Sequence, residues 1–243
     1  MIKIQSLSKS YKAHRVIEDL NLNIKKGVVT GIAGPNACGK TTLIKCILGL
    51  VLPTSGALWI DGELADFHGA FRRKIGYMPQ APQYPGNLCL SELLDMLENL
   101  RGEKAPFRQD LISYFNLGKI LKQPLDQLSG GTKQKVASVI AFMFEVPLII
   151  LDEPTVGLDP VASIQFKDLV LKRSQAGVTI VLVSHIMSEV QAMATEMAFM
   201  NEGKVVFAGG LKDLLAQSQT AHLEVAVTQL FASYQEKSVE CQN

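Results

Sequence analysis

Eight consecutive residues around position 40 have the types and the spacing of a loop that binds phosphate groups. They follow the pattern GxxxxGK[ST], in which backbone N–H groups and the start of the next helix face an anion. The lysine of this pattern reaches the outer phosphates, and the threonine hydroxyl binds Mg²⁺. The eight residues are Gly34, Pro35, Asn36, Ala37, Cys38, Gly39, Lys40 and Thr41. Thr42 is placed to contact an inner phosphate, so the sequence predicts a bound nucleotide with Mg²⁺.

Two adjacent carboxylates end an apolar run much later in the chain. The run Leu148–Leu151 is followed by Asp152 and Glu153, and ligands collect at the carboxyl ends of strands in open α/β sheets. Asp152 is therefore a candidate for holding Mg²⁺ through water. Glu153 is a candidate for orienting and polarising an attacking water, because phosphoryl transfer requires mainly positioning and charge stabilisation from the protein.

The elements that position these residues are strands and helices in alternation. Val28–Ala33 is an apolar run that enters the glycine loop, and Thr41–Leu50 has apolar residues at helical spacing after it. Thr179–Val183, like the run before Asp152, is typical of a buried parallel strand. Ser91 is expected to cap an amphipathic helix that continues to Leu100. A strand with alternating apolar residues is expected at Leu20–Ile24, and hairpins are expected at Ala57–Gly62 and Met197–Phe207. Helical character is expected to continue from Leu100 to about Ala141 and to return after Leu211. The fold class is therefore α/β.

Composition limits the class of protein. The chain has 243 residues, of which 47% are apolar and 19% charged, which is a globular balance. No apolar stretch approaches the roughly 20 residues of a membrane span, and the start of the chain lacks the apolar core of a signal peptide. A net charge of +1 gives no global field that attracts nucleic acid, so no nucleic-acid partner is expected. The four cysteines lack metal-ligand spacing, and a cytosolic chain keeps them reduced.

A third motif connects the two sets of residues to a known family. Leu128, Ser129, Gly130 and Gly131 resemble the signature motif of the ATP-binding cassette (ABC) ATPases, and the resemblance runs from about Ile2 to about Leu215. It implies further roles in family order. Tyr11 resembles the aromatic residue that stacks on adenine, and Gln80 resembles the Q-loop glutamine near Mg²⁺ and the reacting phosphate. Asp159 resembles the D-loop aspartate, and His185 resembles the switch histidine that senses the γ-phosphate.

The resemblance also implies an architecture. The expected fold is an ABC ATPase fold, with a phosphate-loop (RecA-like) parallel sheet core, an antiparallel β subdomain and an α-helical signature subdomain. The ATPase domain is expected to cover residues 1–210, with the helical subdomain inserted at about 84–141. Residues 211–243 are expected to form a short helical C-terminal extension.

The family mechanism that this implies needs two ATPase subunits. ATP lies between the phosphate loop of one subunit and the signature residues Ser129, Gly130 and Gly131 of the other, so a homodimer or pseudo-symmetric heterodimer is expected. Hydrolysis moves a membrane permease, which is expected to dock on Ala81–Leu97. The subunit is thus expected in the cytoplasm, peripheral on the cytoplasmic face of the inner (plasma) membrane through its permease.

Two positions depart from the family pattern. Ala37 stands where glycine is more common, and a positive φ there would cost alanine roughly 1–2 kcal/mol. Thr132 stands where glutamine commonly follows the signature glycines. ATP contact is expected to survive, because Ser129, backbone N–H groups and the helix N-terminus face the phosphate.

The finer resemblance is to exporter-type subunits, and most to the NosF-type ATPases of nitrous oxide reductase maturation, which serve copper-site assembly. Exporters of drugs, lipids or ions share much of the pattern, which lies in Ile75–Gln80, Tyr84–Leu88, Thr155–Ala162 and Leu223–Ala226. A soluble ABC ATPase without a transport role is a second alternative, although such proteins usually carry two cassettes or a long insertion. A scaffold that binds ATP without hydrolysis is a third, although Lys40, Asp152, Glu153 and His185 are all present.

Overall fold

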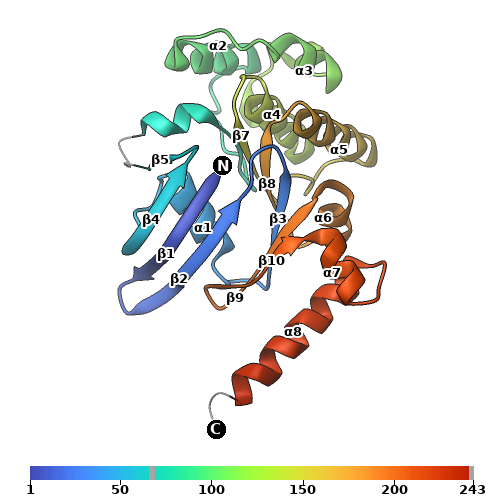
Figure 1. Ribbon diagram of the computed structural model, residues 1–243. Helices are drawn as coiled ribbons and strands as arrows, with labels where there is room; N and C mark the ends of the chain where they lie inside the picture. Colours follow the sequence, from blue (N-terminus) through green and yellow to red (C-terminus); the bar gives the residue numbers. More distant parts are fainter. Residues whose placement is uncertain (66–68, 241–243) are drawn as a thin grey trace. The chain divides into compact units, whose positions relative to one another are not determined.

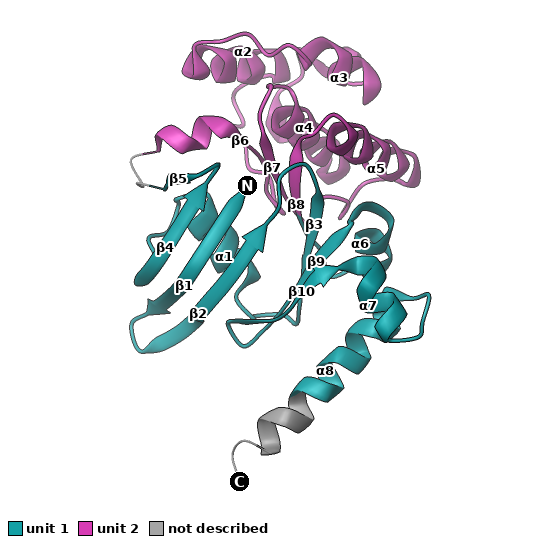
Figure 2. Cartoon of the chain, viewed as in Figure 1, with its two compact units in different colours: residues 1–68, 182–243 teal, residues 69–181 magenta. Residues whose placement is uncertain are grey.

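The computed structural model describes the backbone of residues 1–65 and 69–240, with side chains as far as residue 234 (Figure 1). The chain divides into two compact units, one formed by residues 1–68 and 182–243 and the other by residues 69–181 (Figure 2). Within the described residues, no helix combines the length and the apolar character that crossing a membrane requires.

The first unit contains an antiparallel sheet whose strand order is β2-β1-β4-β5. The central strand β1 pairs on both sides, because Ile2 faces Ile24 of β2 and Ile60 of β4. Apolar and polar residues alternate along β2, and the alternate residues Leu20, Leu22 and Ile24 are buried, as predicted. The strands are β1 (Ile2–Tyr11), β2 (His14–Ile24), β4 (Ser55–Ile60) and β5 (Glu63–Leu64).

A second set of strands in this unit leads into the phosphate loop. β3 (Val29–Ala33) is buried throughout and runs parallel to β9 (Glu196–Asn201), which forms the predicted hairpin with β10 (Lys204–Gly210). The predicted helix after the loop is α1 (Lys40–Ile47), which ends earlier than expected. The helices towards the C-terminus are α6 (Met187–Met193), α7 (Leu211–Gln217) and α8 (Leu223–Glu240).

The second unit carries the strand that ends in the two carboxylates. β7 (Leu148–Asp152) runs parallel to β6 (Ile75–Met78), with Leu148 opposite Ile75. β8 (Thr179–Val183), whose first three residues belong to this unit, neighbours β7 in the strand order. Every residue of β7 and β8 is buried, which confirms the prediction made from their continuous apolar runs.

Helices make up the rest of the second unit, and one of them begins earlier than predicted. The cap of α2 is Cys89 and not Ser91, because the Glu92 carboxylate accepts the Cys89 N–H at 2.8 Å and closes a capping box. Leu100, expected on the buried face of this helix, is 70% exposed. The helices are α2 (Leu90–Arg101), α3 (Arg108–Tyr114), α4 (Gly130–Phe142) and α5 (Pro160–Gln175), with short 3₁₀ turns at Ala70–Lys74, Gly118–Ile120 and Leu125–Gln127.

A buried carboxylate ties α2 to the start of α3. Glu98 is 5% exposed, and its two oxygens accept the Ala105 N–H at 3.0 Å and bind Lys104 Nζ at 2.9 Å. Arg108 Nη1 lies 3.2 Å from the same carboxylate. The Ala105 N–H, followed by the Lys104 ammonium, lowers the pKa of Glu98. The ionised form of Glu98 therefore stabilises this part of the fold.

We expect Glu98→Gln to lower the free energy of unfolding by about 1–2 kcal/mol at neutral pH, through loss of charge-assisted hydrogen bonds. Since the folded pKa lies below the unfolded value of about 4.3, the contribution of Glu98 is complete above that pH and is lost as the pH falls through the folded pKa. Urea unfolding of the unchanged protein and the variant, from neutral pH to below about pH 4, measures the difference in their free energies of unfolding. A difference that does not shrink in acid contradicts this account, and so does an equal difference in the exposed Glu103→Gln variant.

Candidate nucleotide-binding site

The loop between β3 and α1 is held by backbone contacts that exclude side chains at its two glycines. Gly34 has φ 153°, and a Cβ there would lie 2.2 Å from the Met200 carbonyl oxygen. Gly39 has φ 107°, and its Cβ would lie 2.9 Å from the Val16 carbonyl oxygen. Gly39 makes no side-chain capping hydrogen bond to α1, so no cap from that residue competes with an anion for the first N–H groups of the helix.

Lys40 and the residues around it complete the loop. Lys40 Nζ donates to the carbonyl oxygens of Gly34 at 2.7 Å and Pro35 at 2.8 Å, and it lies 3.9 Å from Cys38 Sγ. The ammonium is thus placed over the loop it belongs to. Pro35, Asn36, Ala37 and Thr41 are exposed, Thr42 is half-buried, and Cys38 is buried.

Ala37 has φ 63°, so the position at which the family favours glycine does need left-handed backbone. The left-handed region costs a residue with a Cβ roughly 1–2 kcal/mol. The condition under which alanine is costly at this position, a positive φ, is therefore met in the structure.

We expect Ala37→Gly to raise the free energy of unfolding by about 0.5–1 kcal/mol, since relief of the left-handed strain exceeds the added entropy of the unfolded chain. Ala208→Gly is the matched control, because Ala208 is an exposed strand residue without a positive φ and should lose stability. Thermal unfolding without nucleotide compares the two. Destabilisation by Ala37→Gly as large as that of the control would show that the strain at Ala37 has no energetic weight.

Two further predicted residues lie in the first unit, as the phosphate loop does. Tyr11 ends β1 with 44% of its surface exposed, and Lys9 Nζ lies 4.9 Å from the centre of its ring. An aromatic ring exposed to this extent is available for stacking. His185 follows β8 and is exposed, one residue before the cap of α6.

The second unit holds the carboxylates and Gln80. Asp152 ends β7 and Glu153 follows it, and both are buried. Glu153 has φ 49°, so a residue with a long side chain occupies left-handed backbone here. Burial, followed by the negative charge of Asp152, raises the pKa of Tyr77 on β6 to about 12. Gln80 is exposed, two residues after β6 ends.

The signature residues form the start of α4 in the same unit. Ser129 caps the helix, because its hydroxyl oxygen accepts the Thr132 N–H at 3.3 Å. The hydroxyl oxygens of Ser129 and Thr132 lie 2.9 Å apart. Thr132, which stands where the family commonly has glutamine, therefore forms a hydrogen bond with the capping serine. Ser129 and Gly130 are exposed, and a Cβ at Gly131 would lie 2.7 Å from the Gly157 carbonyl oxygen.

Asp159 caps α5 through the Ala162 N–H at 2.8 Å, and it pairs with Lys135 Nζ at 2.7 Å. The Lys135 hydrogen bond, followed by that of the Ala162 N–H, lowers the pKa of Asp159. Gln134 donates its side-chain N–H to the Pro154 carbonyl at 3.1 Å. Sequence reasoning missed Gln134 and Lys135, although their places three and four residues after Gly131 put them on its face of the helix.

The candidate ligands suit Mg²⁺ and phosphate. Thr41, Gln80 and Asp152 offer a hydroxyl, an amide and a carboxylate oxygen, which are the hard ligands that Mg²⁺ prefers beside phosphate oxygens. Among the side chains of residues 1–65 and 69–234, no group of three or more His, Cys, Asp or Glu is placed to hold a metal ion by itself. Thr41 lies in the first unit, and Gln80 and Asp152 lie in the second.

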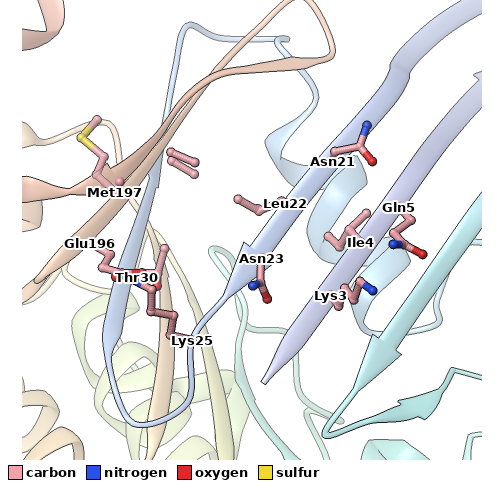
Figure 3. Close-up of a pocket in the computed structure, with 13 residues that line it drawn as sticks. Lys3, Ile4, Gln5, Asn21, Leu22, Asn23, Lys25, Thr30, Glu196 and Met197 are labelled. Atoms are coloured by element: carbon pink, nitrogen blue, oxygen red, sulfur yellow. Dashed lines mark hydrogen bonds and ion pairs between the residues drawn. The ribbon is translucent and has the colours of Figure 1, made fainter.

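A groove of about 490 Å³ in the first unit has a different lining (Figure 3). It lies among β1, β2, β3, β9 and β10, with Lys25 and Glu196 joined as an ion pair at one side. Thr30 is buried at its edge, and the Thr30 hydroxyl has no hydrogen-bond partner among the residues described. None of the predicted nucleotide-site residues lines this groove, so it is separate from the phosphate loop.

Comparison with known proteins decides the family. Residues 17–156, more than half of the chain, match the family described as ABC transporter. The chain belongs to the ABC transporter family. It is 35% identical over 206 residues to the lantibiotic transport ATP-binding protein SrtF of Streptococcus pyogenes, covering 85% of this chain and 89% of SrtF.

Solved structures agree with this family. The ATP-binding subunit of an ABC transporter superposes with a TM-score of 0.89 at 30% identity, over 95% of this chain and 99% of that one. The ATP-binding cassette MJ0796, solved as a dimer in a post-hydrolysis state with ADP and Pi, gives 0.77 at 26% identity, over 87% and 99%. The protein is an ABC transporter ATPase with the ABC ATPase fold, which confirms the predicted mixture of parallel sheet and antiparallel subdomain. The predicted boundaries at 84–141 and 210 stay predictions.

Proposed function

We propose that this ABC ATPase hydrolyses ATP with Mg²⁺ at two shared sites of a head-to-tail dimer and thereby drives an exporter-type membrane permease. The observation that carries the proposal is the phosphate loop, in which both glycines are required by backbone contacts and Gly39 leaves the α1 N-terminus without a side-chain cap. The exposed Ser129 and Gly130 support it, because a signature helix that meets a second copy must present its first turn. The dimeric MJ0796 cassette supports the same assembly.

Within one such site, the proposed roles follow from chemistry. The loop N–H groups, Lys40 and Thr42 bind the phosphates, and Tyr11 stacks on the adenine. Ser129, Gly130 and Gly131 of the second copy face the γ-phosphate with an N-capped helix start. Mg²⁺, when bound by Thr41, Gln80 and Asp152, neutralises charge on the phosphate oxygens.

The remaining residues act on the water and on the subunit boundary. Glu153 orients and polarises the attacking water, since its buried carboxylate lies at the end of β7 beside Asp152. His185 senses the γ-phosphate. Asp159, as the cap of α5, belongs to the segment that meets the second copy.

The proposed partner is a membrane permease that docks on Ala81–Leu97, a stretch that leads into α2 and exposes Glu92, Asp95 and Met96. This places the subunit on the cytoplasmic face of the inner (plasma) membrane. The relative SrtF is named for lantibiotic transport, which supports export as the class of cargo movement. The similarity to NosF-type ATPases stays a prediction, because the name of SrtF points to a different cargo. Drug, lipid and ion cargo remain alternatives.

We expect Glu153→Gln to reduce ATP hydrolysis by about 10²-fold or more while ATP binding is kept, because only the group that orients water is changed. The variant should then form a stable dimer with ATP, which size-exclusion chromatography detects. Glu145→Gln is the control, since Glu145 is an exposed carboxylate just after α4. Turnover near that of the unchanged protein would remove Glu153 from the proposed role.

A second prediction concerns the sharing of each site between two copies. Lys40→Ala disables the phosphate loop of its own copy, and Ser129→Arg drives a bulky charge towards the phosphate bound by the opposite copy. Each homodimer then has two defective sites. A mixed dimer has one site with both lesions and one intact site, so we expect mixing the two variants to restore part of the ATPase activity or, where both sites must act together, part of the ATP-dependent dimerisation.

Two different affinity tags identify the mixed dimers in this experiment. Mixing Lys40→Ala with Glu153→Gln is the matched control for the ATPase readout, because both lesions lie on the same side of the ATP and a mixed dimer gains no intact site. The contrary outcome is mixed dimers of Lys40→Ala and Ser129→Arg, confirmed by their tags, that recover neither ATPase activity nor ATP-dependent dimerisation. That result would show that Lys40 and Ser129 do not meet across a subunit boundary.

A further inference from the structure

The helix that begins with the signature glycines also holds the segment that carries Glu153. α4 contacts the chain between β7 and α5 at three residues, Gly131, Gln134 and Lys135. Their spacing of three and four residues places them on one face of the helix. All of these contacts lie within the second unit. One face of α4 is therefore shared between the signature motif and the catalytic strand end.

Gln134 makes the contact nearest to Glu153. Its side chain is 2% exposed, and its Nε2 donates to the Pro154 carbonyl at 3.1 Å. Pro154 directly follows Glu153 and is itself buried. A buried amide that donates to a backbone carbonyl fixes the orientation of that peptide group, because breaking the bond leaves two polar groups away from water. Gln134 thus restrains the peptide that follows the catalytic carboxylate.

The backbone of Glu153 needs such a restraint. Its φ of 49° lies in the left-handed region, which costs a residue with a Cβ roughly 1–2 kcal/mol. A residue stays in such a conformation only where its surroundings hold it. The Val156 N–H bonds to the Glu153 carbonyl at 3.3 Å, which closes the turn, and Gln134 holds the peptide inside that turn.

The far end of the same segment is held by the next residue of α4. Lys135 Nζ pairs with Asp159 at 2.7 Å, and Asp159 is the cap of α5. Between the two ends, Gly131 lies so close to the Gly157 carbonyl that a Cβ would be 2.7 Å from it. The segment from Glu153 to Asp159 is thus attached to α4 at its start, its middle and its end.

We propose that Gln134 is a positioning residue for ATP hydrolysis, which holds Glu153 at the angle that orients water, and that Lys135 anchors the other end of the same segment. The proposal rests on the proposed role of Glu153. Gln134 faces the Pro154 carbonyl and not the nucleotide, so its loss should affect the chemical step and leave ATP affinity as it is. The first turn of α4 meets ATP held by the second copy, so α4 connects that contact to the Glu153 of its own copy.

The test compares Gln134→Met with the unchanged protein. Methionine keeps the length of the buried side chain but has no N–H to donate, so we expect kcat to fall about tenfold, the effect of one lost buried hydrogen bond, with KM within about twofold. Ser138→Ala is the matched control, since Ser138 is buried one turn later on α4 and bonds to the Gln134 carbonyl at 3.0 Å. That control should lose stability in thermal unfolding and keep its kcat.

A second pair of variants separates positioning from general damage. In a Glu153→Gln background the positioned carboxylate is gone, so adding Gln134→Met should lower the residual rate by less than about twofold, because two residues that act as a unit are not additive. A further tenfold loss in that background, or an unchanged kcat in Gln134→Met alone, overturns the proposal. Normal turnover in Glu153→Gln alone instead overturns the role of Glu153, which is a different result.

Lys135→Met keeps the proposal testable where Gln134→Met does not fold. Lys135 is partly exposed, so the fold tolerates its replacement, and loss of the Asp159 pair should lower kcat about threefold with KM unchanged. Lys133→Met is its control, because Lys133 lies on α4 two residues away. An unchanged kcat in Lys135→Met, or an equal loss in Lys133→Met, overturns the anchoring of this segment.

Discussion

The close approach of backbone to backbone around the phosphate loop is the constraint on which the rest of the site depends. The obstacles to a Cβ at Gly34 and Gly39 are carbonyl oxygens of Met200 and Val16, and no change of rotamer can move them. The turn after β9 continues this arrangement, since the Gly203 N–H bonds to the Cys38 carbonyl at 3.0 Å and the Gly203 carbonyl accepts the Glu18 N–H at 3.1 Å. Segments distant in sequence therefore hold the loop in place.

Glycine also permits a close backbone approach at the start of α4, because the Gly157 carbonyl oxygen occupies the space that a Cβ on Gly131 would need. A motif that sequence comparison treats as a nucleotide contact is thus also a packing contact within the second unit. Its two glycines differ in this respect, because nothing lies within 4 Å of a Cβ built on Gly130. Within the part of the chain that the structure describes, packing therefore does not explain a glycine at position 130.

The sequence predicts the buried strands well, because they follow from local patterns. Continuous apolar runs predict β7 and β8, whereas the family pattern at Ala37 indicates only that a positive φ there would be costly, and the structure supplies that φ. The sequence predicts Ser91 as the cap of α2, whereas the structure has Cys89. The hydrogen bond from the Cys89 N–H to the Glu92 carboxylate is a side-chain geometry that composition does not show. Gln134 was missed for a related reason: its partner is a backbone carbonyl 20 residues away, and backbone acceptors carry no sequence signal.

The fold follows from patterns along the chain, but the cargo does not. Phosphate chemistry is common to all ABC ATPases, and the permease selects the cargo, so this chain contains little information on what is moved.

The left-handed backbone at Glu153 lowers the stability of the fold, while the side chain of the same residue is proposed to act in turnover. Glycine or asparagine accepts this conformation at lower cost, so either replacement would relieve the backbone strain at this position and at the same time remove the carboxylate. A choice of residue made for low backbone strain alone would therefore omit the carboxylate that is proposed to orient water. Under the role proposed for Glu153, the chain accepts backbone strain at this position in order to keep a carboxylate at the end of β7.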